Sequence, residues 1–218
     1  MVPLAFHARA VLLAALALLW PVAAESATIN ATVTDEKGRP LRDAVVMVTP
    51  APGTPAPRPD DNRLATAFID QTDETFIPGV VVIRPGGTVV IRNNDSIRHH
   101  VYSFSPLNRF EFVQLPGATS QPIVFSQAGA IAIGCNIHDQ MAAHVLVTAA
   151  PWGVVTDAEG KAVIDAVPAG RFVATVWHPR LRPGVEPPTL KLELATDQST
   201  LSVTIPVLPP RRVRARDY

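Results

Sequence analysis

The stretch "GVVVIRPGGTVVIRNND", residues 79–95, decides the fold class. Two runs of valine and isoleucine flank a Pro-Gly-Gly turn, and an Asn-Asn-Asp turn follows them. β-Branched residues favour strands, and glycine, proline, asparagine and aspartate favour the turns between strands. The stretch therefore predicts two strands joined by a short turn.

The rest of the chain repeats this pattern outward from that stretch. Short apolar runs recur between turn residues, among them "AVVMV", "IVFSQAGAIAIGC", "AAHVLV", "RFVATVWH" and "LSVTI". The 22 prolines suit the many turns and edge positions of such a chain. With no helical period beyond the N-terminal region, the sequence predicts an all-β sandwich or barrel.

The N-terminal region has the features of an export signal. Arg9 precedes an apolar run from Ala10 to Ala24, which is shorter than the roughly 20 residues of a membrane span. Val22-Ala23-Ala24 supplies small residues for signal peptidase. We expect residues 1–24 to be a cleaved signal peptide and the mature chain to be periplasmic, without stable membrane insertion. An uncleaved anchor is the alternative.

Charge and cysteine content exclude other classes. The 19 basic and 19 acidic residues balance, so nothing points to a nucleic-acid partner. The basic end, residues 208–218, is interpreted as a solvated tail. A single cysteine cannot form an intramolecular disulfide, and the thiol therefore needs another role.

That cysteine lies in the stretch "GCNIHDQM", residues 134–141. Cys135, His138 and Met141 place a thiolate, an imidazole and a thioether within seven residues, between two predicted strands. One more imidazole would complete the ligand set of a blue-copper site. Zinc favours a tetrahedral set without a thioether, and iron–sulfur clusters need more cysteines.

The second imidazole is expected from "TVVIRNNDSIRHHVYSF", residues 88–104, which contains His99 and His100. Successive residues of a strand point to opposite faces, so only one of the two histidines should face the metal. From the residues alone, both stay open.

These stretches together resemble cupredoxins of the plastocyanin and amicyanin type. The resemblance covers "IDQTDETFIPGVVVIRPGGTVVIRNNDSIRHHVYSF" and "GCNIHDQM", and it is nearest to secreted plastocyanin-like proteins of the methylamine utilisation type. It implies a Greek-key β-sandwich that binds one copper ion, cycling between Cu(II) and Cu(I), through His99, Cys135, His138 and Met141. His100 replaces an asparagine common in the family, and Arg98 and Asp139 replace prolines.

A repeat flanks this region. "VTDEKGRPLRDAV" (33–45) and "VTDAEGKAVIDAV" (155–167) agree at seven of thirteen positions, and they resemble the two hairpins of a carboxypeptidase regulatory-like sandwich. The resemblance implies that a copper domain, 62–149, is inserted between 25–61, which ends in a Pro-rich linker, and 150–207.

The function predicted from the sequence is single-electron transfer by a periplasmic type 1 copper protein that is not an enzyme, with an unidentified periplasmic redox protein as partner. A copper carrier or sensor without electron transfer is the main alternative. An enzyme with Cys135 as nucleophile would leave Met141 without a role, and a metal-free interaction sandwich is the remaining possibility.

Overall fold

The computed structural model describes residues 26–54, 65–195 and 197–210. These residues form sixteen strands and their connections, so the predicted all-β sandwich fold is confirmed. The signal peptide, the second half of the Pro-rich segment and residues 211–218 lie outside the described residues. No helix in the described part of the chain has the length and apolar character needed to cross a bilayer.

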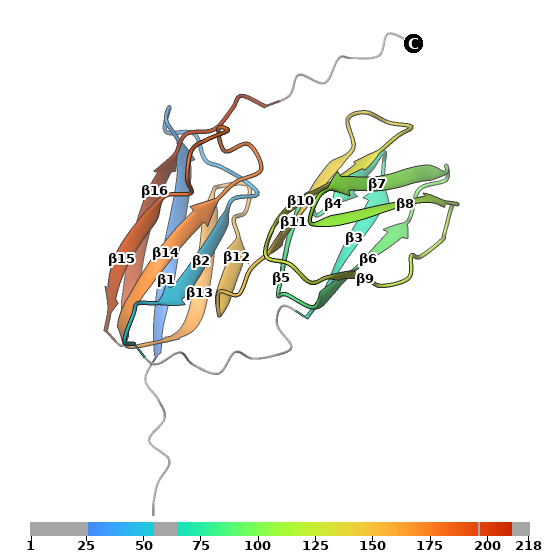
Figure 1. Ribbon diagram of the computed structural model, residues 1–218. Coiled ribbons are helices and arrows are strands. Elements are labelled where there is room, and N and C mark those ends of the chain that lie inside the picture. The colour runs from blue at the N-terminus through green and yellow to red at the C-terminus, as the bar shows by residue number, and fades with distance from the viewer. Residues whose placement is uncertain (1–25, 55–64, 196, 211–218) are drawn as a thin grey trace, which may run out of the picture.

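Two sheets form what we call the flanking sandwich (Figure 1). One sheet has the order β13-β1-β16 and the other β12-β2-β14-β15. Alternate residues of the strands in both sheets, such as Ile29, Val46 and Phe172, form the core between the sheets. The strands are β1 (Ser26–Asp35), β2 (Val45–Pro50), β12 (Trp152–Val155), β13 (Lys161–Pro168), β14 (Gly170–Trp177), β15 (Thr189–Leu194) and β16 (Gln198–Ile205).

The remaining strands form the central sandwich, which lies beside the first in Figure 1. Its sheets have the orders β5-β11-β10-β7-β8 and β4-β3-β6-β9. The core between them includes Ile69, Ile91, Phe125 and Ile133. The strands are β3 (Thr66–Thr72), β4 (Thr75–Ile77), β5 (Val80–Ile83), β6 (Gly87–Asn93), β7 (His99–Ser105), β8 (Asn108–Gln114), β9 (Ile123–Phe125), β10 (Gly129–Cys135) and β11 (Ala142–Val147).

The two copies of the repeat form the same turn. Asp35 Oδ1 accepts the N–H groups of Lys37 and Arg39, and Asp157 Oδ1 accepts those of residues 159 and 161. Gly38 and Gly160 occupy equivalent places with φ of 75° and 71°, where glycine is favoured. Strands from both copies belong to the flanking sandwich. The domain boundaries and the carboxypeptidase-like assignment stay predictions.

One end of the central sandwich brings three separate segments together. β10 ends at Cys135, which pairs with Val101 of β7, and β7 begins at His99. The Asn136 N–H donates to the His100 carbonyl at 2.9 Å, which holds the loop after β10 against the start of β7. The β3–β4 turn lies at the same end, since Gln71 pairs with Asn93 near the end of β6.

Candidate metal centre

Cys135 owes its position to the alternation of β10. Ile131, Ile133 and Cys135 point into the core, while the residues between them face outward. Cys135 is 3% exposed and forms no disulfide. Its sulfur therefore sits at the end of the core, where the strand gives way to the loop that carries His138.

The two adjacent histidines of β7 face opposite ways, as strand alternation predicts. His99 is fully buried, and its Nδ1 lies 3.7 Å from Cys135 Sγ. His100 is partly exposed and its Nε2 lies 2.9 Å from the Glu111 carboxylate. The structure therefore brings His99, and not His100, to the cysteine.

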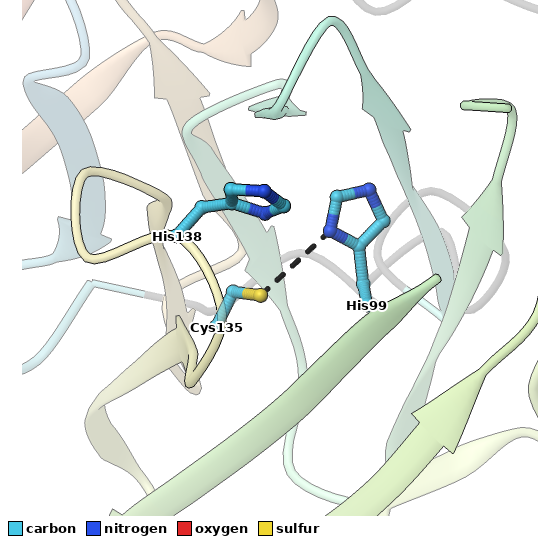
Figure 2. Close-up of side chains that lie close together, drawn as sticks. All are labelled: His99, Cys135 and His138. Atoms are coloured by element: carbon cyan, nitrogen blue, oxygen red, sulfur yellow. Dashed lines mark hydrogen bonds between the residues drawn. The ribbon is translucent and has the colours of Figure 1, made fainter. Parts of the chain in front are cut away.

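His138 completes a group of three (Figure 2). One potential ligand atom from each of His99, Cys135 and His138 lies within 4.8 Å of the other two. The two imidazole rings are 5.3 Å apart between centroids and inclined at 64°. Such spacing lets two nitrogens and one sulfur converge on a single ion, because metal–ligand bonds of about 2.0–2.3 Å separate neighbouring ligand atoms by roughly 3–4 Å.

Asp95 fixes the orientation of His99. The His99 Nε2 and Asp95 Oδ2 atoms are 2.7 Å apart, so Nε2 carries the proton toward an ionised carboxylate and Nδ1 keeps its lone pair on the cysteine side. Burial acts to raise the pKa of Asp95, but the hydrogen bond from His99 and two backbone N–H groups outweigh it and lower that pKa. Asp95 is therefore held as a carboxylate.

His138 presents an unpaired nitrogen. Its Nδ1 is buried and has no hydrogen-bond partner among the described residues, while its Nε2 lies 3.7 Å from Glu74 Oε2. A buried polar atom without a partner carries a desolvation cost of about 1–3 kcal/mol. Coordination of a cation by this nitrogen would remove that cost.

Met141 is the fourth predicted ligand. It is 3% exposed and belongs to the same core cluster as Cys135. Its N–H donates to the His138 carbonyl at 3.0 Å, which closes the loop from β10 to β11 into a turn. The structure thus places the thioether residue in the same core cluster as the cysteine.

A buried amide network supports the His99 loop, and sequence reasoning missed it. The Asn93 Nδ2 donates to the carbonyls of Ile97 and Gln114, and Asn93 Oδ1 accepts the Asp95 N–H at 3.0 Å. The Gln114 side chain in turn accepts from Gln71 at 2.7 Å. Asn93 is fully buried, whereas the adjacent Asn94 is exposed.

The donor set fits copper in its type 1 form. Two imidazole nitrogens and a cysteine sulfur lie together out of solvent, and Met141 is buried in the same core cluster as the cysteine. Soft sulfur ligands with two imidazoles suit copper. The Asp95 carboxylate orients His99 as the outer partners of metal-bound histidines do. A bound cation would also give His138 Nδ1 the partner that it lacks among the described residues.

The chain's two further described histidines lie away from this group. His144, on β11, lies near Trp177, with ring centroids 6.1 Å apart and ring planes inclined at 60°. His178 is buried in the flanking sandwich: its Nε2 donates to the Arg42 carbonyl and its Nδ1 accepts the Arg180 N–H. Both have packing roles.

No family model and no curated protein matches the chain. Among solved structures, a reduced Cu(I) form of an amicyanin mutant is 17% identical over 38% of this chain and 82% of its own, with a TM-score of 0.35. A purple cupredoxin from Nitrosopumilus maritimus is 22% identical over 38% of this chain and 99% of its own, with a TM-score of 0.34.

Amicyanin from Paracoccus versutus is 19% identical over 49% of this chain and 100% of its own, with a TM-score of 0.35. Since every one of these TM-scores is below 0.5, the matches do not assign the chain to a family, and the case for its chemistry rests on its own residues.

Proposed function

We propose that this chain is a type 1 copper protein of the cupredoxin kind that carries single electrons between redox partners, with His99, Cys135, His138 and Met141 as ligands. The observation that carries the proposal is the buried group of His99, Cys135 and His138, in which one imidazole nitrogen has no hydrogen-bond partner in the part of the chain that the structure describes. When bound, copper supplies a one-electron Cu(II)/Cu(I) couple.

The protein's own contribution is a rigid, dry set of ligands. Cys135 ends a strand, His99 begins one, and Asp95 holds the His99 ring by its Nε2–H. Ligands fixed in this way keep nearly the same geometry in both oxidation states, which favours fast electron exchange. His138 is the most exposed of the four at 7%, so we assign to it the point where electrons enter and leave.

The cellular setting belongs to the same proposal. The N-terminal signal-like segment supports export to the periplasm, where an unidentified periplasmic redox protein would be the partner. A role as carrier is favoured over a role as enzyme, because the sequence offers Cys135 no oxyanion donors or evident substrate site.

A copper carrier or sensor without electron transfer is the competing function. It needs a metal that exchanges readily, as exposed methionine or histidine tracts provide. The potential ligands here are all buried, and the whole chain has three methionines. Burial therefore favours the electron carrier.

The test is a Cu(II) titration of the purified protein beside Cys135→Ser, followed by visible absorption and EPR. We expect an intense thiolate-to-copper band that saturates at one equivalent and is absent from the variant. A colourless wild type, or copper binding unaffected by the substitution, would reject the proposal. Metal exchange with a chelator within seconds would favour the carrier instead.

A further inference from the structure

The β3–β4 turn approaches both histidines of the candidate centre, although the sequence gives it no metal-binding motif. Asp73 and Glu74 form its tip. The Glu74 carboxylate faces the Nε2 edge of His138 at 3.7 Å. The same oxygen accepts a hydrogen bond of 3.0 Å from the Gln140 side chain, so the carboxylate is held at the loop that carries His138.

The backbone of the same turn acts on the other histidine. The N–H of Glu74 donates to Asp95 Oδ2 at 3.1 Å, and the N–H of Asp73 donates to Asp95 Oδ1 at 2.5 Å. Asp95 Oδ2 is the atom that meets His99 Nε2. Both imidazoles therefore have their Nε2 edges directed at a carboxylate that the turn either supplies or holds.

The conformation of the turn is unfavourable for its residues. Asp73 and Glu74 have φ of 51° and 53°, a left-handed conformation that costs an L-residue roughly 1–2 kcal/mol and that asparagine and glycine adopt more readily. A turn selected for stability alone would carry Asn-Gly. Residues held in such conformations concentrate at functional sites, and here both strained residues donate to Asp95.

We propose that Glu74 is a positioning residue for the metal centre, holding His138 through its carboxylate and His99 through its N–H to Asp95. This inference rests on the proposed function. The carboxylate favours the Nε2–H form of His138, which leaves Nδ1 as the free lone pair, and its negative charge favours Cu(II) over Cu(I).

The chain offers a matched control for Glu74→Gln and Glu74→Ala. Glu111→Gln removes the same charge from a carboxylate that also pairs with a histidine, His100, on the outer face. Glu74→Gln keeps the shape of the side chain, so it stays informative if the alanine variant folds poorly. Neither Glu74 substitution alters the backbone N–H that holds Asp95.

The first readout uses the metal-free protein. Long-range ¹⁵N–¹H NMR should show His138 as the Nε2–H tautomer in the wild type and in Glu111→Gln. In Glu74→Ala we expect a mixture of the two tautomers. An unchanged His138 tautomer in that variant overturns the inference, whether or not the protein takes copper. A changed tautomer in a chain that gives no blue site rejects the copper function alone.

The second readout is the reduction potential after loading with Cu(II). Mutation of a residue that contacts a metal ligand typically changes the metal affinity by about 10–100-fold. Because Glu74 Oε2 lies 3.7 Å from His138 Nε2, we expect an effect at the lower end of that range. We expect Glu74→Gln to lower the preference for Cu(II) about tenfold, a positive shift of about 59 mV for one electron. Equal potentials for Glu74→Gln and Glu111→Gln would contradict the proposal.

Discussion

At the scale of single residues, His99 and His100 have opposite surroundings. His99 lies in the core between Cys135 and Asp95, and His100 lies on the outer face beside Glu111. Their imidazoles have the same chemistry, so the position on the strand decides which can act. In a strand, a side chain one position further along points to the opposite face of the sheet, so only one of the two histidines can reach the cysteine.

This contrast predicts unequal effects of two alanine substitutions. His99→Ala removes a potential ligand and also the imidazole donor to the largely buried Asp95 carboxylate, so we expect loss of the intense visible band and a protein less stable by about 2–4 kcal/mol. His100→Ala should keep the band and lose less than about 1 kcal/mol, because its ion pair is partly exposed.

Visible spectra and urea unfolding of the two variants provide the measurement. A blue His99→Ala protein beside a colourless His100→Ala protein would reverse the assignment of the strand ligand.

The sequence was informative where the spacing is local. The Cys-x-x-His-x-x-Met spacing lies within one loop, and strand alternation separates His99 from His100. Glu74 and Asp95 could not be found in this way, since acidic residues are ordinary in turns. Only the pairing of β3 with β6, set by the whole sandwich, brings the two turns together.

At the scale of elements, the connection after β14 is fixed by one histidine. His178 is 3% exposed, and its two nitrogens bridge the Arg42 carbonyl and the Arg180 N–H. Burial, together with the nearby charges of Arg180 and His144, lowers the pKa of His178 to about 4, although the hydrogen bond that His178 donates to the Arg42 carbonyl acts to raise it. The neutral ring is therefore the form that fits the fold.

The low pKa of His178 predicts an acid-sensitive flanking sandwich. Between pH 6.5 and 4 the unfolded chain takes up a proton that the folded chain does not, so the free energy of unfolding falls as the pH falls, by about 3 kcal/mol in total. Burial also lowers the pKa of His144, with the same sign. Carboxylates add their own effect below about pH 5.

Urea unfolding from pH 7 to pH 5, followed by tryptophan fluorescence, measures this slope. His178→Gln should be less stable than the wild type at pH 7 and should show a flatter pH profile. A variant with the slope of the wild type would assign the acid sensitivity to other groups.

Turns of the repeat were the most predictable elements. Each turn depends on interactions between residues close in sequence: an aspartate accepts two backbone N–H groups, and a glycine has a positive φ. Both copies of the repeat form this turn. The role of His178 was not predictable, because Arg42 is 136 positions away in the chain. Its partners follow from how the flanking sandwich closes.

At the scale of the whole molecule, the two sandwiches share a third apolar cluster. Val80, Val82 and Leu146 of the central sandwich pack with Val45 of the flanking one, and Met47, Val155 and Trp177 cover them. All four residues of β5 are buried. Val81 and Ile83 face the central core while Val80 and Val82 face the neighbouring sandwich, which explains the unbroken "VVVI" run.

The shared cluster predicts that the two sandwiches unfold together. Apolar side chains that are buried only while both are folded couple their stabilities, and Leu→Ala at a buried site costs about 2–5 kcal/mol. Leu146→Ala should therefore separate the unfolding of the sandwiches. Val147→Ala, the neighbouring substitution, removes a side chain that faces the central core, so it should lower stability without separating them.

Two probes distinguish the sandwiches without copper. Trp152 on β12 packs against the core of the flanking sandwich, whereas Trp177 on β14 covers the shared cluster. Fluorescence of Trp152, measured in a Trp177→Phe background, therefore follows the flanking sandwich. Methyl NMR signals of Ile131 and Ile133 follow the central core. Coincident midpoints in the wild type and in Val147→Ala, with separate midpoints in Leu146→Ala, are the expected result. Separate midpoints already in the wild type would mean that the cluster does not couple the stabilities of the two sandwiches, and the flanking sandwich would then be an independently stable domain tethered to the one that holds the candidate metal centre.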